Sequence, residues 1–473
     1  MNKVSEPFDY DVAILGGGSA GYAAARTAAA SGLRTVVIEG AEAVGGLCIL
    51  RGCMPTKALL YAAEVMNLAS HAQPWGIHAE RVSFDFTQVM ARKNALIQEF
   101  ADYRCGQLAG GKFEFIRAHA RFLDPHTVSL NPLPPDQSAP RVFTARHFII
   151  ATGSAIAPPP LPSLSEVGYI TSDDVMELKQ LPKSLIVLGG GAVAVELAQF
   201  FARFGVQVTL LQRSEHILRE FDPDAAVEIE KVFRREGLDV FTGTELTGAR
   251  RDGSLKTLSF RHHGQPKTVV AEEILHALGR TPNTSSLQLD RAGVVTERGR
   301  IVANEFMQTS APHIYTAGDC TGPHGIVHLA VQQGEIAAQH IARPEAARQM
   351  DYRLLIAVVF TEPQVALVGL TEREAQSRNI PFLAASYPFN DHGKSLIMEA
   401  RDGFVKLLAD PKTGEILGGA CVGPMGGELI HEIVAAMSKR MNVHELAALP
   451  HYHPTLAEIW TYPAEELAEQ IPG

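Results

Sequence analysis

The sequence predicts an α/β fold with two parallel-sheet units and a C-terminal α+β domain, and three observations support this. A short apolar strand, a glycine-rich turn, a helix and a second strand follow one another in residues 10–39. The same order returns in residues 184–212. From Asp351 onward the pattern changes to strands grouped before a helix, which indicates a separate domain. The elements expected there are strands at Val365–Val368, Phe404–Leu408 and Ile416–Val422 and an amphipathic helix at Glu428–Arg440.

The first unit begins with the apolar strand Tyr10–Leu15. The turn Gly16–Gly21 follows it and leads into an alanine-rich helix over Tyr22–Ser31. The second strand, Thr35–Ile38, is followed at once by Glu39. A strand, a glycine turn, a helix, a strand and an acidic residue form the order that a dinucleotide-binding βαβ unit requires.

The second unit repeats this order. It has a strand at Ser184–Leu188, the turn Gly189–Ala194, a helix that ends near Phe204 and a strand at Val206–Leu211. In both units 23 positions separate the first glycine of the turn from the residue that follows the second strand. One such fingerprint is weak evidence, but two in full strand–turn–helix context indicate two Rossmann-like dinucleotide sites.

Each glycine of the first turn has a physical role. Gly16 permits the tight turn, Gly18 lets a pyrophosphate approach the backbone, and Gly21 lets the helix pack close to the strand. The helix N-terminus then faces the phosphates. Glu39 can accept hydrogen bonds from both ribose hydroxyls. The alternative, a glycine-rich turn in an unrelated α/β domain, does not account for this complete pattern.

Cys48 and Cys53 lie five positions apart in the chain. A disulfide across so short a loop constrains little chain, so stability explains it poorly. A redox role explains it better, with one thiol exchanging with a substrate disulfide and the other with a cofactor. The alternatives are half of a metal site or two core thiols, and a zinc site would need a second pair. The remaining cysteines are isolated, at Cys105, Cys320 and Cys421.

Composition excludes several classes of protein. The chain has 473 residues with 46% hydrophobic and 20% charged, which is ordinary for a globular enzyme of several domains. The net charge of −10 makes nucleic acid an unexpected partner. We expect neither a membrane span, since no apolar run is long enough, nor a signal peptide, and the odd, sparse cysteines favour a reducing, cytoplasmic location. Proline-rich stretches at Pro132–Pro135 and Pro158–Pro162 predict surface connections.

With these motifs in hand, the chain resembles the flavin-dependent pyridine nucleotide–disulfide oxidoreductases, the family of dihydrolipoamide dehydrogenase, glutathione reductase and mercuric reductase. The pattern is nearest to that of dihydrolipoamide dehydrogenase and covers nearly the whole chain. The motifs that follow in family order are the first fingerprint, the cysteine pair, Ala151–Gly153, the second fingerprint, Gly279–Asn283, Ile314–Asp319 and the late His453–Thr455.

The resemblance implies four segments and a homodimer. They are a first part of an FAD-binding domain at 1–154, an NAD(P)-binding domain at 155–282, a second part of the FAD-binding domain at 283–350, and a dimerisation domain at 351–473. It also implies a set of FAD-binding residues: Gly16, Gly18, Ser19, Gly21, Glu39, Gly46, Lys57, Ala120, Thr152, Gly153, Asp319, His328, Leu329 and Ala330. Lys57 is expected beside the flavin and paired with Glu196, where an ammonium would stabilise the reduced ring.

The resemblance makes His453 the acid/base that protonates the leaving thiol, in the active site of the other subunit. Glu458, five residues later, is placed to hold its imidazole in one tautomer. By itself such a spacing would indicate only a surface contact. His451 matches a position of lesser role, and a metal site made from His444, His451 and His453 is the less favoured alternative.

The second fingerprint favours NADP over NAD, although NAD is possible. Gln212 stands where an NAD site would carry an acidic residue, and Arg213 and Arg219 follow it. Guanidinium groups bind a 2′-phosphate that a carboxylate would repel. The alternative is that both arginines face solvent. The other nicotinamide-site residues implied are Gly189, Gly191, Val193, Glu196 and Gly279.

The substrate is expected to be a small or protein-bound disulfide or dithiol, with a lipoyl group favoured and docking on a lipoyl-bearing protein as an option. An NADPH-dependent reductase of another disulfide is the first alternative. A transhydrogenase or flavin-binding module with idle cysteines is the second. Mercury is set aside because no cysteine occurs near the C-terminus, and glutathione is disfavoured because Glu335 would repel it. Leu50 and Arg51 replace the usual residues between the cysteines.

Overall fold

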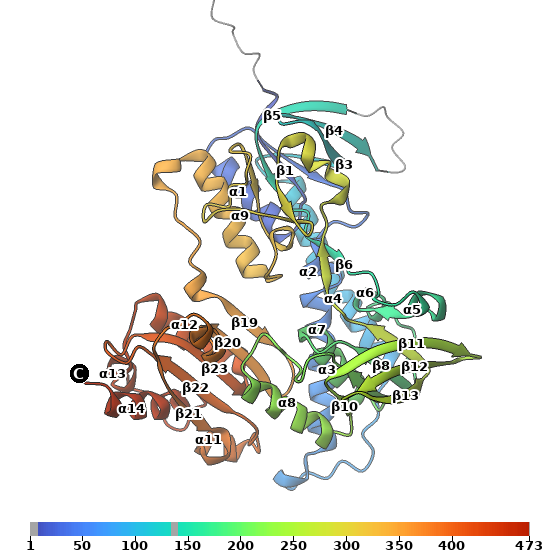
Figure 1. Ribbon diagram of the computed structural model, residues 1–473, viewed down its shortest axis with the longest axis vertical. Helices are drawn as coiled ribbons and strands as arrows, with labels where there is room; N and C mark the ends of the chain where they lie inside the picture. The colour runs from blue at the N-terminus through green and yellow to red at the C-terminus, as the bar shows by residue number, and fades with distance from the viewer. Residues whose placement is uncertain (1–7, 134–140, 473) are drawn as a thin grey trace, which may run out of the picture. The chain divides into compact units, whose positions relative to one another are not determined.

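The computed structural model describes residues 8–133 and 141–472, which form two compact units (Figure 1). Unit 1 is made of Met1–Pro55, Ala91–Ala157 and Gly279–Met350, and unit 2 of Thr56–Met90, Pro158–Leu278 and Asp351–Gly473. The expected connection at Pro132–Pro135 lies partly outside the described residues. The one at Pro158–Pro162 covers the loop before helix α5 and the first residue of that helix, Pro162.

A parallel sheet in the order β3-β2-β1-β5-β18 forms the centre of unit 1. Strand β4 pairs antiparallel with the outer parts of β3 and β5. The strands are β1 Tyr10–Leu15, β2 Thr35–Glu39, β3 Glu114–Asp124, β4 Thr127–Pro132, β5 Arg141–Ile150 and β18 Ile314–Thr316. Their β-branched and aromatic side chains form the buried core of the unit. Both faces of such strands are apolar, because other elements cover the sheet on both sides.

Two helices of unit 1 pack side by side, α1 (Ser19–Ala30) and α9 (Val327–Ala342). Small residues allow this approach, since a Cβ added at Gly334 would lie 2.3 Å from the carbonyl oxygen of Ala20. Helix α1 begins three residues earlier than the predicted Tyr22, because the end of the glycine turn already forms its first turn. The remaining elements of this unit are α2 Gly46–Leu50, β6 Ser154–Ile156, β15 Arg280–Pro282, β16 Thr296–Glu297, β17 Arg300–Ile301 and the 3₁₀ turns 285–287, 289–292, 319–321 and 344–346.

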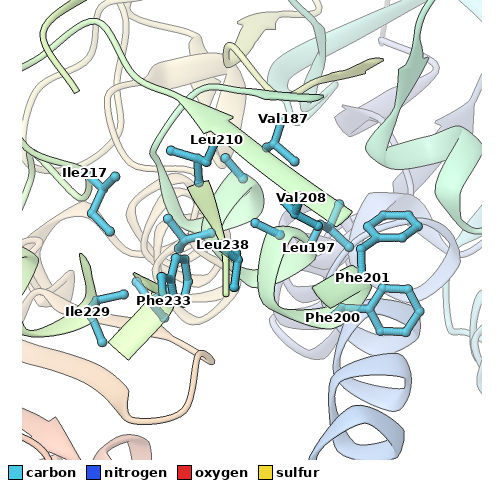
Figure 2. Close-up of a cluster of buried hydrophobic side chains, with 14 of the residues drawn as sticks. Val187, Leu197, Phe200, Phe201, Val208, Leu210, Ile217, Ile229, Phe233 and Leu238 are labelled. Carbon is cyan, nitrogen blue, oxygen red and sulfur yellow. The ribbon is translucent and has the colours of Figure 1, made fainter. Parts of the chain in front are cut away.

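Unit 2 contains a second parallel sheet, in the order β10-β9-β8-β14-β7. Its strands are β7 Ile170–Thr171, β8 Ser184–Leu188, β9 Gln207–Leu211, β10 Asp239–Phe241 and β14 Glu273–His276. Helices α7 (Ala192–Arg203) and α8 (Pro223–Arg235) pack on it, and Figure 2 shows Phe201, Phe233 and Leu210 in the buried cluster between them. An antiparallel sheet of β11 Thr244–Asp252, β12 Leu255–His262 and β13 Gln265–Ala271 is added, with short helices α5 Pro162–Val167 and α6 Ser172–Val175.

The C-terminal part of unit 2 is an antiparallel sheet in the order β19-β20-β23-β22-β21. The three predicted strands and the predicted helix are all present, and the helix begins and ends two residues earlier than expected. The elements are β19 Ile356–Val359, β20 Gln364–Gly369, α10 Glu372–Ser377, β21 Leu383–Pro388, α11 Gly393–Ile397, β22 Phe404–Ala409, β23 Ile416–Gly423, α12 Gly426–Ser438, α13 Val443–Ala447 and α14 Thr461–Gln470, with 3₁₀ turns at 352–354, 389–391 and 457–460.

Two long helices, α3 (Cys53–Ser70) and α4 (Phe86–Ala109), connect β2 to β3 in the sequence, with a 3₁₀ turn at 73–75 between them. Helix α3 begins at the second cysteine of the pair, and α2 contains the first. The fold therefore places the two cysteines at adjoining helix ends.

Candidate functional site

The glycine turn of unit 1 has no room for side chains. Gly16 has a φ of +109°, and a Cβ there would lie 2.3 Å from the carbonyl oxygen of Ala151. A Cβ at Gly21 would lie 1.8 Å from the carbonyl oxygen of Gly16. Gly18 precedes α1, so the backbone N–H groups of the helix start are directed to the space that a phosphate would occupy.

Glu39 ends β2 and is 7% exposed. Its carboxylate accepts hydrogen bonds from the backbone N–H of Gly17 at 2.8 Å and of Ala41 at 2.7 Å. These bonds fix the carboxylate beside the turn. It retains acceptor capacity for ribose hydroxyls, because an ionised carboxylate offers about four lone-pair sites.

The other predicted flavin-lining residues of unit 1 surround this turn in sequence-distant segments. The hydroxyl oxygen of Thr152 is buried and has no hydrogen-bond partner among the described residues. Asp319 accepts a hydrogen bond from the hydroxyl of Ser154 at 2.6 Å. Arg280 in turn donates from Nε to the Ser154 hydroxyl oxygen at 2.9 Å. The sequence analysis included Arg280 in the motif Gly279–Asn283 but gave it no role, and it did not name Ser154, because 126 positions separate the two residues in the chain.

The remaining expected flavin contacts differ in setting. Ala120 lies on β3 opposite Leu130, and Gly153 has a φ of +69° in the turn after β5. His328, Leu329 and Ala330 form the first turn of α9. Apart from Ala120 within β3, the expected FAD-binding residues of unit 1 therefore lie at the carboxyl ends of β1, β2, β5 and β18 and at the starts of α1, α2 and α9.

The start of the helix that carries the first cysteine approaches the same turn. Both thiol side chains are half-buried. Helix α2, which carries Cys48, begins at Gly46, and a Cβ added at Gly46 would lie 2.8 Å from the Cα of Gly18. Leu50 packs on the strained Gly45, whose φ is +147°, and Arg51 is exposed. The helix of the first cysteine is thus in backbone contact with the candidate phosphate site.

Lys57 and Glu196 form the predicted ion pair in unit 2. The Lys57 ammonium lies 2.9 Å and 3.1 Å from the two carboxylate oxygens, and the Glu196 side chain is 4% exposed. The Phe360 ring lies 4.4 Å from the Lys57 nitrogen, and the Phe360 N–H donates to Glu196 at 2.9 Å. Sequence reasoning missed Phe360, because nothing near it in the chain signals a cation–π contact.

The second glycine turn repeats the geometry of the first. Gly189 has a φ of +115°, and a Cβ there would lie 2.5 Å from the carbonyl oxygen of Ala277. Gly191 precedes α7, and Val193 in its first turn is 44% exposed. Gly279, with a φ of +110°, belongs to unit 1.

The residues expected to choose the nicotinamide follow β9. The Gln212 amide donates to the hydroxyl of Ser214 at 2.7 Å and packs against Gly190. Arg213 is exposed. Arg219 is exposed too, and its guanidinium lies 3.1 Å from the carboxylate of Glu220. The end of β9 therefore carries an amide and two accessible guanidinium groups.

His453 and Glu458 meet as predicted. The His453 Nδ1 lies 3.0 Å from a Glu458 carboxylate oxygen. The other oxygen lies 3.4 Å from Nε2 of His392, a fully buried residue whose pKa burial lowers. The His453 side chain is 78% exposed, so an oriented imidazole is presented to the outside of unit 2.

His451 and Glu335, which the sequence analysis also considered, each form ion pairs with neighbouring side chains. His451 lies 2.7 Å from the carboxylate of Glu432, and the described side chains contain no group of histidine, cysteine and acidic residues arranged to hold a metal ion. Glu335 is ion-paired with Arg26 at 2.5 Å and Arg348 at 3.2 Å. Its charge is therefore compensated, and the argument that it repels an anionic substrate is not supported by its contacts.

The comparisons agree with this geometry. The family described as "Pyridine nucleotide-disulphide oxidoreductase" matches residues 10–334, and its dimerisation domain matches residues 355–464. The chain belongs to the pyridine nucleotide–disulphide oxidoreductase family, as the motifs predicted. It is a flavoprotein disulfide oxidoreductase that works with FAD and a pyridine nucleotide.

Relatives match over nearly the full chain. Dihydrolipoyl dehydrogenase of Thermus scotoductus is 36% identical over 471 residues, 98% of each chain. That of Geobacillus stearothermophilus is 34% identical over 454 residues, 96% of this chain and 95% of the relative. Mercuric reductase of Bacillus cereus is 33% identical and covers 95% of this chain and 70% of the relative.

Solved structures give the same result. LpdA from Mycobacterium tuberculosis superposes with a TM-score of 0.86 at 29% identity, covering 96% of this chain and 99% of that one. The HOCl-induced flavoprotein disulfide reductase RclA from Escherichia coli superposes with a TM-score of 0.84 at 26% identity, with coverage of 96% and 99%. In the part of the chain that the structure describes, no helix is both long and apolar enough to cross a membrane.

Proposed function

We propose that Cys48 and Cys53 are the redox-active pair of an enzyme that interconverts a dithiol and a disulfide, with a lipoyl-type dithiol as the favoured substrate. The observation that carries this proposal is the backbone contact between Gly46, at the start of the Cys48 helix, and Gly18 of the phosphate turn. The contact supports the proposal that the cysteine pair lies beside the FAD site. The dihydrolipoyl dehydrogenases among the relatives support the choice of substrate.

The residues of unit 1 fit FAD. The turn at Gly16–Gly21 leaves backbone N–H groups for a pyrophosphate, and Glu39 offers ribose acceptors. Thr152 supplies a buried hydroxyl that needs a polar partner. When bound, FAD supplies the two-electron chemistry that connects a nicotinamide to a dithiol.

In the reductive direction, the Cys48 thiolate attacks one sulfur of the substrate disulfide. The substrate S–S bond breaks, a mixed disulfide forms, and the leaving thiolate takes a proton. Cys53 then attacks the Cys48 sulfur, which releases the second substrate thiol and leaves a Cys48–Cys53 disulfide. The substrate gains two electrons and the cysteine pair loses two, which NAD(P)H restores. The oxidation of a dithiol follows the same steps in reverse.

In a homodimer, His453 of the partner subunit would donate the proton that the leaving thiolate takes. Its imidazole is exposed, and Glu458 holds Nδ1 at 3.0 Å, which leaves Nε2 to exchange a proton with the substrate thiol. The match of a dimerisation domain to residues 355–464 supports the dimer.

NADP is the proposed nicotinamide, because the end of β9 carries Gln212 instead of an acidic residue and exposes Arg213 and Arg219. Alanine at both arginines should raise KM for NADPH roughly 10- to 100-fold, the value of one or two charged hydrogen bonds, and leave KM for NADH unchanged. Arg251→Ala, an exposed arginine on β11, is the control. A matched loss for both nucleotides would refute the assignment.

Turnover assays test the substrate. Dihydrolipoamide with NAD or NADP should be oxidised, and lipoamide should be reduced by NADPH, faster than a panel of other disulfides. A clear preference for another disulfide would establish instead an NADPH-dependent reductase of that compound. The cytoplasmic location stays a prediction that the sparse cysteines support.

A further inference from the structure

Helix α4 carries a half-buried arginine that no motif identifies, Arg104. Its guanidinium carbon lies 4.3 Å from the centroid of the Tyr22 ring on α1. Its Nε and Nη1 atoms are buried and have no hydrogen-bond partner among the described residues. Buried charged donors without a partner are costly, so their presence indicates a ligand that the protein does not itself supply.

The setting of Arg104 is close to the cysteine pair. Cys105, the next residue on α4, has its Sγ 3.9 Å from the carbonyl oxygen of Val44, so this part of α4 adjoins the segment that leads to Cys48. Burial lowers the pKa of Arg104, and Tyr22 and Cys48 oppose this effect. An arginine keeps its proton in such a site. The nearby Arg26 differs, because its guanidinium is paired with Glu335 at 2.5 Å. Arg104 thus presents uncompensated N–H donors on the Cys48 side of unit 1.

We propose that Arg104 forms an anion subsite beside Cys48 that binds a carboxylate of the disulfide or dithiol substrate. The inference rests on the proposed role of Cys48 and adds a preference to it: among lipoyl-type and other low-molecular-weight disulfides, those that carry a free carboxylate bind more tightly than their amides. The planar guanidinium suits this group, because its N–H donors match two carboxylate oxygens. A substrate with a neutral amide in place of the carboxylate has no negative charge to attract the unpaired N–H groups of Arg104.

The Tyr22 ring supports the geometry. Tyr22 fixes the plane of the guanidinium by stacking and forms no hydrogen bond with it, so Nε and Nη1 keep their need for a partner. Because Tyr22 lies on α1, and the glycine turn of unit 1 leads into α1, a bound FAD phosphate is the competing source of the anion. The experiment separates the two sources by measuring flavin content.

Alkylation of the reduced holoenzyme tests the subsite without turnover. Iodoacetate and iodoacetamide react with a thiolate by the same displacement of iodide and differ in one negative charge. Peptide mass mapping gives the rate at which each reagent alkylates Cys48. The ratio of the two rates does not depend on the fraction of Cys48 present as thiolate, because both reagents react with the same thiolate. In Arg104→Gln this ratio should fall about tenfold, as expected when one charged hydrogen-bond partner is lost.

The control is Arg92→Gln, an exposed arginine on the same helix, 12 residues before Arg104 and therefore about 18 Å away along the axis. It removes the same charge and should leave the ratio unchanged. Arg104→Lys, which keeps the charge but lacks the fork, should give an intermediate ratio. An unchanged ratio in Arg104→Gln would overturn the proposal, and so would loss of flavin in that variant alone.

Turnover gives the second readout. Arg104→Gln should raise KM for lipoate and for 3,3′-dithiodipropionate about tenfold and leave KM for lipoamide and the dithiodipropionate diamide unchanged. An equal loss for charged and neutral disulfides would overturn the subsite and leave Arg104 as a group that acts on the Cys48 thiolate. If the wild-type enzyme reduces none of these compounds, the proposed function fails, while the alkylation ratio still decides the subsite.

Discussion

Removing the carboxylate of Glu362 should stabilise the protein at alkaline pH. Glu362 lines a cavity of about 180 Å³ in unit 2 together with Arg203 and Glu64. Burial raises its pKa from 4.5 to about 7, and Arg203 opposes this effect. Because the native state holds the proton more tightly than the unfolded chain, stability falls as the pH rises from 4.5 to 7 and stays low above it.

The magnitude follows from the two pKa values. Each tenfold difference in proton affinity is worth about 1.4 kcal/mol, so the ionised carboxylate costs the native state about 3 kcal/mol at pH 8. Glu362→Gln removes this cost. Its free energy of unfolding should exceed that of the wild type by about 3 kcal/mol at pH 8 and by less than about 1 kcal/mol at pH 5.

Urea unfolding of the two proteins at both pH values measures this difference. Glu465→Gln, an exposed glutamate on α14, should show no such pH dependence. An effect of Glu362→Gln that is equal at pH 5 and pH 8, or a destabilisation at pH 8, would refute the reasoning.

Three further outcomes are expected. Glu458→Gln should lower kcat for disulfide turnover roughly 100-fold, because His453 loses the charge that orients it, while NADPH oxidation by ferricyanide stays unchanged; an equal loss of both rates would contradict this role. Phe233→Ala should lower the free energy of unfolding by about 3–5 kcal/mol, since Phe233 is fully buried in the cluster of Figure 2. Lys406→Ala should cost about 3 kcal/mol in the same urea assay, because the carboxylate of Asp222, whose side chain is 10% exposed, loses its ion partner 3.6 Å away. A cost within about 0.5 kcal/mol in either variant would contradict these assignments.

The sequence predicted the strands and helices around the two glycine turns because local rules determine them. Hydrophobic runs, glycine conformations and the acid after the second strand all act over a few residues, and strand β8 agrees with its prediction at both ends. The pairing of His453 with Glu458 was also within reach, since only five residues separate them.

Contacts between distant segments could not be predicted in this way. Phe360 reaches Lys57 from 303 positions further along the chain, and His392 reaches Glu458 from a different element. Arg104 lies on a helix whose pattern carries no signal of ligand binding, so only the buried, unsatisfied donors reveal it. Such contacts depend on tertiary packing, which spacing along the chain does not encode.

The most direct test of the redox pair is the Cys48→Ser variant, assayed for reduction of its disulfide substrate by NAD(P)H and, in the same preparation, for reduction of ferricyanide. The structure places Cys48 on helix α2, which begins beside the glycine turn of unit 1. The account predicts that disulfide reduction is lost and that ferricyanide reduction remains, with flavin content unchanged. Disulfide reduction at the wild-type rate in Cys48→Ser would contradict it.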